Sequence, residues 1–302
     1  MGTHFSVSPS PSRFSTIGVP RFELGASPTR TERATRLRHT PSRERVAATD
    51  YHRGVARRDE IVAFANALLE VEKWQEFAPP GLQVVGSAEV TRIACGVSAS
   101  LELFERAAAA GAELVLVHHG MFWRNEPLVV DRRLRGRLEA LFAANMSLVA
   151  YHLALDAHPE VGNSAQLARR LGIDGPLETF AGVGVGGRLS QRATVADLAA
   201  RVHETVDREP LVFAGGAELV ERVAVSTGAA GYELIRAAHE GYDCLVTGEP
   251  EEPTLHTARE LGIHLIAAGH DATERLGVQA LATRIGDEFD VAWEFIDVDN
   301  PV

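Results

Sequence analysis

Apolar and polar positions along the chain follow two periods, one typical of strands and one typical of helices. Short apolar runs that predict strands occupy residues 82–86, 92–97, 114–117, 147–151, 210–214, 222–226, 243–249, 264–270 and 292–296. Apolar residues recur at helical spacing in residues 60–71, 100–110, 134–145, 164–171, 194–206, 231–240, 254–261 and 273–286. Strands that alternate with helices in this way predict an α/β fold with mixed or parallel sheets.

The strand predicted at residues 114–117 is followed by two adjacent histidines and a glycine, His118, His119 and Gly120. In open α/β sheets, ligands bind at the carboxyl ends of the strands. Adjacent side chains on an extended strand point to opposite faces, but past the strand end Gly120 would let both histidines turn to one side. The pair suits a metal site, because neutral imidazole is a common ligand. The alternative is one hydrogen-bonded core histidine beside one solvated histidine.

The two halves of the chain resemble each other, which predicts a duplicated fold. Residues 92–117 align with residues 222–247 at a constant offset of 130, without a gap, and at this offset His119 aligns with Glu249. Six aligned pairs are identical: Arg92/Arg222, Ala94/Ala224, Arg106/Arg236, Ala107/Ala237, Ala108/Ala238 and Gly111/Gly241.

A second alignment, at an offset of 118, matches residues 148–156 with residues 266–274. In both segments a predicted strand is followed by the pattern His-x-x-x-acid. Because duplicated strand ends would face each other across a pseudo-twofold axis, polar side chains from both halves are expected to converge. The converging set is His118, His119, Asp156, His270 and Glu274, with His152 and Glu249 nearby.

Three histidines and two carboxylates form a donor set typical of a metal centre. Buried carboxylates are costly without a partner, and a cation supplies one. Because the set contains no cysteine, borderline or hard divalent ions suit it: Zn²⁺, Mn²⁺, Fe²⁺, Co²⁺ or Ni²⁺. Five ligands exceed what one tetrahedral ion takes. Two ions about 3.5–4 Å apart, bridged by one carboxylate, would use all five ligands and leave positions for water.

Composition and charge exclude several classes of protein. The two cysteines, Cys95 and Cys244, argue against a disulfide framework, so a cytoplasmic location is expected. Residues 1–58 carry 11 arginines and 4 acidic residues (+7), and the remaining chain carries 19 basic and 37 acidic residues (−18). An acidic body does not suit a nucleic-acid-binding protein. No apolar run approaches the roughly 20 residues that a membrane-spanning helix needs.

Residues 1–53 are rich in Ser, Thr, Pro and Arg and show no periodicity. Three interpretations fit: a solvated disordered tail, translation from a start codon assigned too early with true initiation near Val55, or an organelle transit segment. The sequence then predicts a first α/β repeat at 54–175, a connecting hairpin and helix at 176–217, and a second repeat at 218–302.

Two local patterns make further predictions. The spacing Gly-x-Gly-x-Gly-Gly in residues 182–187 precedes a strand-like segment, whereas a phosphate-binding loop leads directly into a helix N-terminus. A hairpin turn is therefore predicted there. Asn163 is predicted to cap the N-terminus of the helix at residues 164–171.

From residue 59 to its end, the chain resembles the GTP cyclohydrolase I type 2 homologues, also called Nif-three-like dinuclear metal centre hexameric proteins. It is most similar to the short bacterial branch, without an inserted domain. The resemblance is carried by residues 80–84 (PGLQV), 118–123 (HHGMFW), 152–160 (HLALDAHPE), 246–249 (VTGE) and 267–275 (AAGHDATER).

The resemblance implies a duplicated two-domain α/β fold, a toroidal homohexamer, and two divalent metal ions per subunit facing an inner cavity. The ligands that it implies are His118, His119, Asp156, His270 and Glu274. It makes Glu274 the bridging ligand, with His119 and Asp156 on one ion and His118 and His270 on the other. The sequence departs from the family pattern at Pro80, where a polar residue is usual, and at Asp271, where His or Tyr is common.

The expected function is metal-assisted hydrolysis of a small substrate by an activated water. His152 is a candidate general base, or alternatively a hydrogen-bond partner of Asp156. Glu249 is a candidate acceptor for a ligating histidine. Phe122 and Trp123 would either form a stacking wall or belong to the core. The family name suggests a nucleotide-like substrate, and the alternative function is a non-catalytic metal-binding protein.

Overall fold

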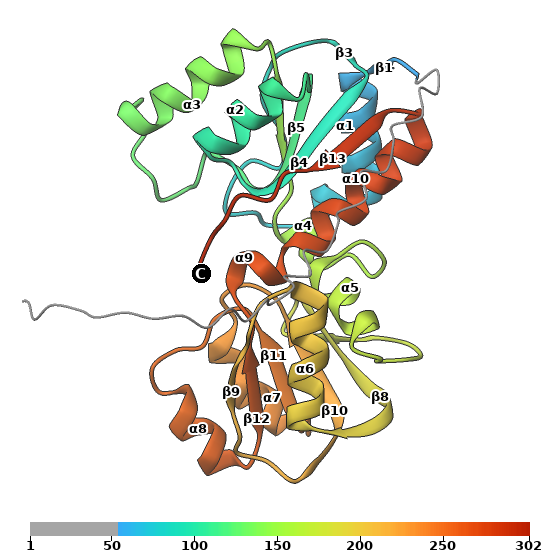
Figure 1. Cartoon of the computed structure of the whole chain (residues 1–302), viewed down its shortest axis with the longest axis vertical. Helices are drawn as coiled ribbons and strands as arrows, with labels where there is room; N and C mark the ends of the chain where they lie inside the picture. The colour runs from blue at the N-terminus through green and yellow to red at the C-terminus, as the bar shows by residue number, and fades with distance from the viewer. Residues whose placement is uncertain (1–53) are drawn as a thin grey trace, which may run out of the picture. The chain divides into compact units, whose positions relative to one another are not determined.

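A five-stranded sheet in the order β13-β4-β5-β6-β2 forms the first layer of the fold (Figure 1). Four of its strands run parallel and β2 runs antiparallel to β6. The strands are β2 (Gly81–Val84), β4 (Arg92–Ser98), β5 (Leu114–His119), β6 (Ser147–Ala150) and β13 (Ala292–Phe295). The structure is a computed structural model that describes residues 54–302, so the predictions for residues 1–53 lie outside the described part.

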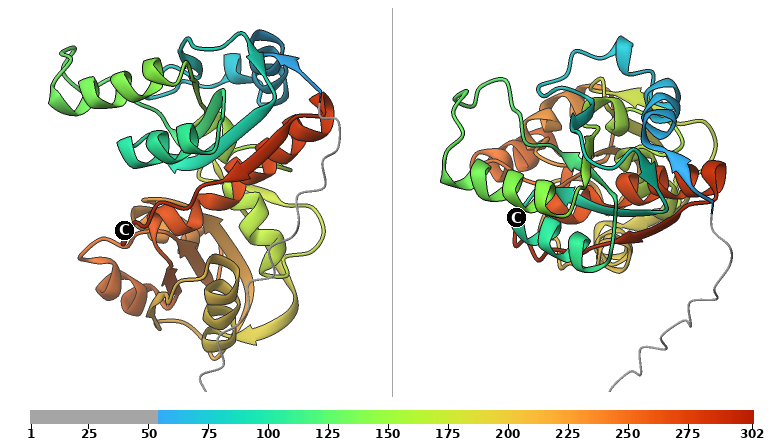
Figure 2. Two further views of the ribbon diagram at one scale, coloured as in Figure 1. Left: turned by 45° about the horizontal axis from the view of Figure 1, so that its top comes forward. Right: turned by 90° about the horizontal axis from the view of Figure 1, so that it is seen from above.

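Helices cover both faces of this sheet because its central strands are apolar on both sides. Leu114 and Leu116 of β5 pack against α1 (Arg58–Leu68) and α10 (Arg275–Phe289). Val115 and Val117 instead pack against α2 (Leu101–Ala109) and α3 (Arg132–Ala143). Figure 2 shows α10 passing from the region of α9 to this sheet.

A six-stranded sheet in the order β7-β8-β10-β11-β12-β9 forms the second layer. Its strands β10, β11 and β12 are parallel, and the others are antiparallel to their neighbours. The strands are β7 (Glu178–Phe180), β8 (Gly184–Thr194), β9 (Leu211–Phe213), β10 (Leu219–Ser226), β11 (Cys244–Thr247) and β12 (His264–Ala267).

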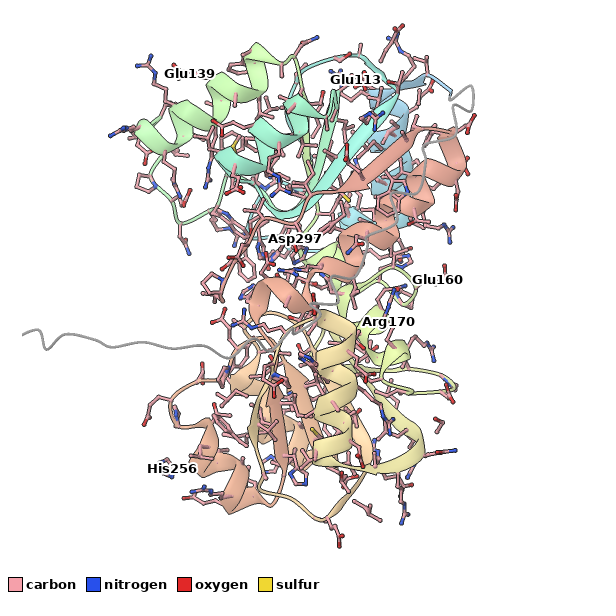
Figure 3. All side chains as sticks on the ribbon, viewed as in Figure 1. Glu113, Glu139, Glu160, Arg170, His256 and Asp297 are labelled. Atoms are coloured by element: carbon pink, nitrogen blue, oxygen red, sulfur yellow. The ribbon has the colours of Figure 1, made fainter. Side chains whose placement is uncertain are left out.

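One face of the second sheet packs against α5 (Asn163–Arg170) and α6 (Val195–Val206). The other face packs against α7 (Leu234–His239) and α8 (Thr254–Leu261). Charged side chains such as Arg170 on α5 are exposed (Figure 3). The remaining short elements are β1 (Ala56–Arg57), paired with β3 (Glu89–Val90), η1 (Val71–Lys73), η2 (Gly231–Glu233), α4 (Leu153–Asp156) and α9 (His270–Thr273).

The sequence repeat is reproduced by the pairing of the strands. Ile93 pairs with Leu114 in the first sheet and Val223 with Cys244 in the second, so both strands keep the offset of 130. The duplicated α/β fold is therefore confirmed. The third strands differ from the prediction, because Leu114 pairs with Ser147 whereas Cys244 pairs with His264. Their offset is 117, not 118.

The sheets divide the chain differently from the predicted ranges. The segment 275–295 was predicted within the second repeat. It forms α10, which packs against the first sheet, and β13, which is a strand of that sheet. The segment 178–213, predicted as a connection, supplies three strands of the second sheet. Its glycine-rich part is the predicted hairpin, in which Phe180 pairs with Gly184. Within residues 54–302, no helix is long and apolar enough to cross a membrane.

Candidate metal centre

The five side chains that the sequence predicts as ligands lie together. His118 and His119 end β5, and Asp156 ends the short helix α4. His270 begins α9, and Glu274 lies between α9 and α10. His118, Asp156 and Glu274 are buried, whereas His119 and His270 are partly exposed. The site thus joins strand ends and short helices that are far apart in the sequence.

Glu274 is at the centre of the cluster. Its Oε2 lies 3.1 Å from Nε2 of His119 and 3.2 Å from Nε2 of His270. Its Oε1 lies 3.6 Å from Nε2 of His118, which is also 3.5 Å from Oδ2 of Asp156. Among the described residues, Nε2 of His118 and Oε2 of Glu274 are buried atoms without a hydrogen-bond partner. Such atoms are costly unless something binds them, and a cation fits this donor set.

The other ring nitrogen of each of these histidines has a partner in the protein. Nδ1 of His118 lies 2.9 Å from the carbonyl oxygen of Tyr151, and Nδ1 of His119 lies 3.0 Å from Oγ of Ser98. Nδ1 of His270 lies 2.5 Å from Oε1 of Glu249, so this glutamate contacts a histidine that the sequence predicts as a ligand. A proton on Nδ1 leaves the lone pair of Nε2 free to bind a metal ion, so these contacts prepare the three rings as ligands.

Asp156 is held by a residue whose role the sequence did not reveal. Asn163 Nδ2 donates a hydrogen bond to Oδ1 of Asp156 at 2.9 Å, and the backbone N–H of Gly277 donates to Oδ1 of Asn163 at 2.7 Å. The prediction that Asn163 caps a helix is wrong, because Gly162 is the N-cap and Asn163 is the first helical residue. The amide instead fixes the carboxylate so that Oδ2 faces His118.

Gly120 also has a different role from the predicted one. β5 extends through His119, and Gly120 is not among the glycines with positive φ. A Cβ at Gly120 would lie 2.4 Å from the side-chain amide of Gln83. A side chain at this position would therefore displace the Gln83 amide. The rings of His118 and His119 converge, with centroids 4.7 Å apart, at the end of an extended strand.

Carboxylates dominate the charge state of two histidines. Burial lowers the pKa of His118, but Asp156 and Glu274 outweigh burial and raise this pKa to about 9. Burial likewise lowers the pKa of His270, and Glu274 with Glu249 raises it to about 9. Near neutral pH and without a bound cation, both imidazoles are therefore protonated on both ring nitrogens and positively charged. A cation that binds a ring nitrogen would have to displace one of these protons.

The pKa values of the two carboxylates are shifted in opposite directions. Burial raises the pKa of Asp156 to about 6, against the opposing charge of His118. Burial favours the neutral form of Glu274 as well, but the surrounding histidines hold its pKa well below the usual value. Glu274 is consequently the permanent negative charge of the cluster.

His152 borders the cluster. Among the described residues its hydrogen bond with Asp156 is a backbone one, from the N–H of Asp156 to the carbonyl oxygen of His152 at 3.0 Å, and its ring makes none to the Asp156 carboxylate. His152 is the N-cap of α4, and its ring centroid lies 4.9 Å from that of His118. Nδ1 is buried without a hydrogen-bond partner, 3.7 Å from Oε2 of Glu76. Burial, followed by the charges of the neighbouring histidines, lowers the pKa of His152 to about 3.

Glu76 is a second residue that the sequence did not single out. Its carboxylate accepts hydrogen bonds from the backbone N–H groups of Leu153, at 3.1 Å, and Ala154, at 2.8 Å. It thereby fixes the first turn of α4, which carries Asp156. Because this contact joins residues more than 70 positions apart, no local pattern in the sequence indicates it.

The two aromatic candidates have different roles. Phe122 packs on the core between the first sheet and α2. The centroid of the Trp123 ring lies 5.2 Å from that of His152 and 5.8 Å from that of His119. Trp123 therefore belongs to the edge of the site.

The ligand atoms form groups that differ from those the resemblance implies. His119, His270 and Glu274 place one atom each within 4.8 Å of one another, and so do His118, Asp156 and Glu274. His152 forms a third such group with His118 and His119. The resemblance pairs His119 with Asp156 instead. Glu274 belongs to both carboxylate-containing groups in the structure, and it is also the ligand that the resemblance places between the two ions.

The whole described part of the chain matches a known family. The model of Duf34/NIF3 (NGG1p interacting factor 3) matches residues 56–301. The chain belongs to this family. A relative from Pseudomonas aeruginosa, named GTP cyclohydrolase 1 type 2 homolog, is 46% identical over 246 residues, which cover 80% of this chain and 97% of the relative.

Two solved structures share the fold of this chain. The protein ybgI, described as of unknown function, is 40% identical, with a TM-score of 0.78 over 82% of this chain and 100% of that one. TTHA1606 from Thermus thermophilus is 35% identical, with a TM-score of 0.76 over the same shares. The resemblance stated from the sequence is thus confirmed.

Proposed function

We propose that the chain binds two divalent metal ions, with Glu274 as the bridging ligand, and that it hydrolyses a small substrate. The observation that carries the proposal is the position of Glu274, whose two oxygens face different histidine nitrogens. The unpartnered atoms of His118 and Glu274 further support a cation at this point. The metal identity (Zn, Mn, Fe, Co or Ni), the toroidal hexamer and the cytoplasmic location stay predictions of the sequence.

The metal ions and the residues around them are assigned different roles in the reaction. Divalent ions held here would lower the pKa of a bound water toward 7 and supply a nucleophile. Glu249, Ser98 and the carbonyl of Tyr151 orient the three histidine rings. With a pKa of about 3, His152 is neutral at pH 7 and a weak base, so we assign it the orientation of the reacting water.

Metal binding is expected to release protons. Because the pKa values of His118 and His270 are about 9, both rings are protonated at pH 7 and must lose a proton to bind an ion. The two rings should release about two protons per chain at pH 7 and close to none at about pH 10, and ionisation of a bound water adds up to about one proton to either number. Calorimetric titration with Zn²⁺ in buffers of different ionisation enthalpy measures this number. A release that is the same at both pH values would contradict the assignment.

Hydrolysis is tested with the reconstituted protein. With Mn²⁺ or Co²⁺, the chain should turn over at least one member of a panel of phosphoester, amide and nucleotide substrates. His152→Asn should lower kcat about 100-fold or more while the bound metal is retained. The control is His256→Asn, because His256 is an exposed histidine on α8. A protein that keeps its metal and shows no turnover on the panel would favour the non-catalytic metal-binding protein.

A further inference from the structure

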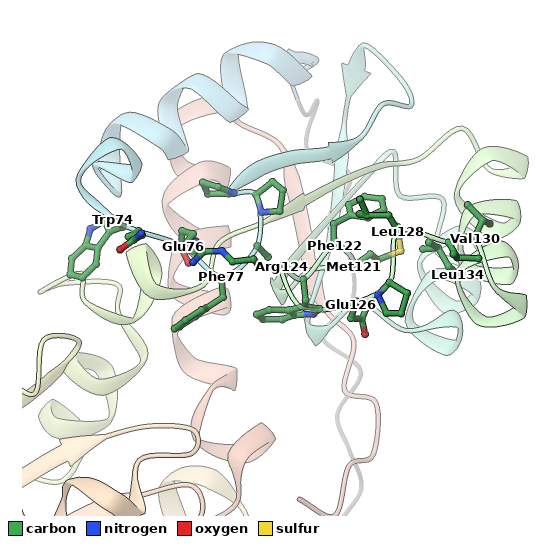
Figure 4. A pocket seen from close by; sticks show the side chains of 17 residues that line it. Trp74, Glu76, Phe77, Met121, Phe122, Arg124, Glu126, Leu128, Val130 and Leu134 are labelled. Atoms are coloured by element: carbon green, nitrogen blue, oxygen red, sulfur yellow. The ribbon is translucent and has the colours of Figure 1, made fainter.

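A cavity of about 770 Å³ lies beside the metal centre, between the segments 74–80 and 121–130 (Figure 4). Its walls are mainly aromatic and aliphatic: Trp74, Phe77, Met121, Phe122, Trp123 and Leu128. This volume is in the range of small-molecule sites, which are concave and largely apolar. The sequence did not predict the cavity, because its two walls come from different loops.

The cavity is continuous with the metal centre through shared side chains. Trp123 lines it and also approaches the rings of His119 and His152. Phe77 lines it from the other side, with its ring centroid 6.1 Å from that of His152. Glu76, whose carboxylate lies 3.7 Å from His152, is a third lining residue. A molecule that rests on Trp123 therefore has one end at the cluster.

The charged groups of the cavity do not suit a phosphate. Among the described residues that line it, Arg124 is the single cation, and its guanidinium donates a hydrogen bond to the carbonyl oxygen of Glu76 at 2.6 Å. The other charged lining residues are Glu76 and Glu126, and Glu126 accepts hydrogen bonds from Arg133 at 3.1 Å. A polyphosphate would meet two carboxylates and one engaged cation, whereas an uncharged ring has no ionic charge to desolvate and so enters at a much smaller cost.

We propose that this cavity binds an uncharged planar heteroaromatic ring, stacked on Trp123, and that no phosphate chain accompanies the ring into it. The ring is the recognised part of the substrate, and its edge points to His152 and the metal centre. This link to the reaction rests on the proposed function, but binding of the ring does not depend on metal or turnover. Base–aromatic stacking of this kind tolerates different rings.

Equilibrium dialysis of metal-free protein with guanosine and with GTP tests the proposal. The two probes share one ring and differ in the phosphates. Guanosine should bind saturably below about 1 mM, and GTP should bind no more tightly. Trp123→Leu should weaken guanosine binding about tenfold or more. Phe142→Leu is the matched control, because Phe142 is an exposed aromatic residue on α3 that does not line the cavity.

Several results of these measurements would overturn the proposal for the cavity, and one would overturn the proposed function alone. Absence of saturable guanosine binding, tenfold tighter binding of GTP, or equal affinities of the wild type and Trp123→Leu would overturn the proposal. So would a cavity covered by a second copy of the chain, in which case Leu128→Ser would change the sedimentation behaviour without producing saturable guanosine binding. Failure of hydrolysis with guanosine binding intact would overturn the proposed function alone.

Discussion

Glu274→Gln is expected to reduce the metal content from two ions per chain to at most one, and to weaken binding of the remaining ion about 100-fold or more. The carboxylate is the permanent negative charge of the cluster and the only side chain shared by both ligand groups that contain a carboxylate. An amide of the same shape offers one acceptor oxygen and places an NH₂ group where the second should be. Titration with Mn²⁺ or Zn²⁺ measures the change.

Glu252→Gln serves as the control for Glu274→Gln, because Glu252 is exposed just before α8 and the charge change is the same. This control should bind both ions as the wild type does. Circular dichroism of the metal-free variants establishes that both are folded. If Glu274→Gln retained two tightly bound ions, a bridging role for this residue would be refuted.

Gly228→Ala is expected to disrupt the same centre from a residue that is not a ligand. Gly228 has a φ of +68°, and a Cβ there would lie 2.3 Å from Oε1 of Glu274 and 3.2 Å from Nε2 of His270. Alanine at positive φ costs about 1–2 kcal/mol in backbone strain. In addition, the methyl group must displace the carboxylate of Glu274. We expect loss of at least one ion, together with a lower midpoint of thermal unfolding.

The variant Gly262→Ala separates the effect of backbone strain from the effect of the steric clash between a Cβ at Gly228 and Glu274. Gly262 has a φ of +67°, and no atom lies within 4 Å of the position that a Cβ would occupy there. This variant should show a similar loss of stability while it binds metal as the wild type does. Equal metal affinities of the two variants, measured in the same titration, would mean that the approach of Gly228 to Glu274 is unimportant.

Much of the fold follows from local patterns in the sequence. The apolar runs and helical spacings indicate nearly every element, and the offset of 130 between residues 92–117 and 222–247 reappears as the strand pairing. The predicted alignment of the third strands of the two repeats differs by one residue from the strand pairing, because their apolar runs give no unique alignment. Gly269, with a φ of +92°, lies just before His270, where the connection from β12 into α9 differs from its counterpart in the first repeat.

The five clustered side chains could be predicted from the sequence, and so could Glu249, but Asn163, Glu76 and Ser98, which contact residues of the cluster, could not. His118, Asp156 and Glu274 follow predicted elements, so their type and position carry a signal. Asn163 fits a local capping pattern, and only the tertiary structure brings it to Asp156 and Gly277. The return of α10 and β13 to the first sheet likewise depends on packing between distant segments, for which a short strand pattern contains no information.

The central claim is that one chain holds two metal ions bridged by Glu274. Elemental analysis of the chain, reconstituted with Mn²⁺, Zn²⁺ or Co²⁺ and dialysed, tests this claim most directly. The account predicts two ions per chain in the wild type for at least one of these metals. One ion per chain or none, with every metal and with the protein folded, would contradict it.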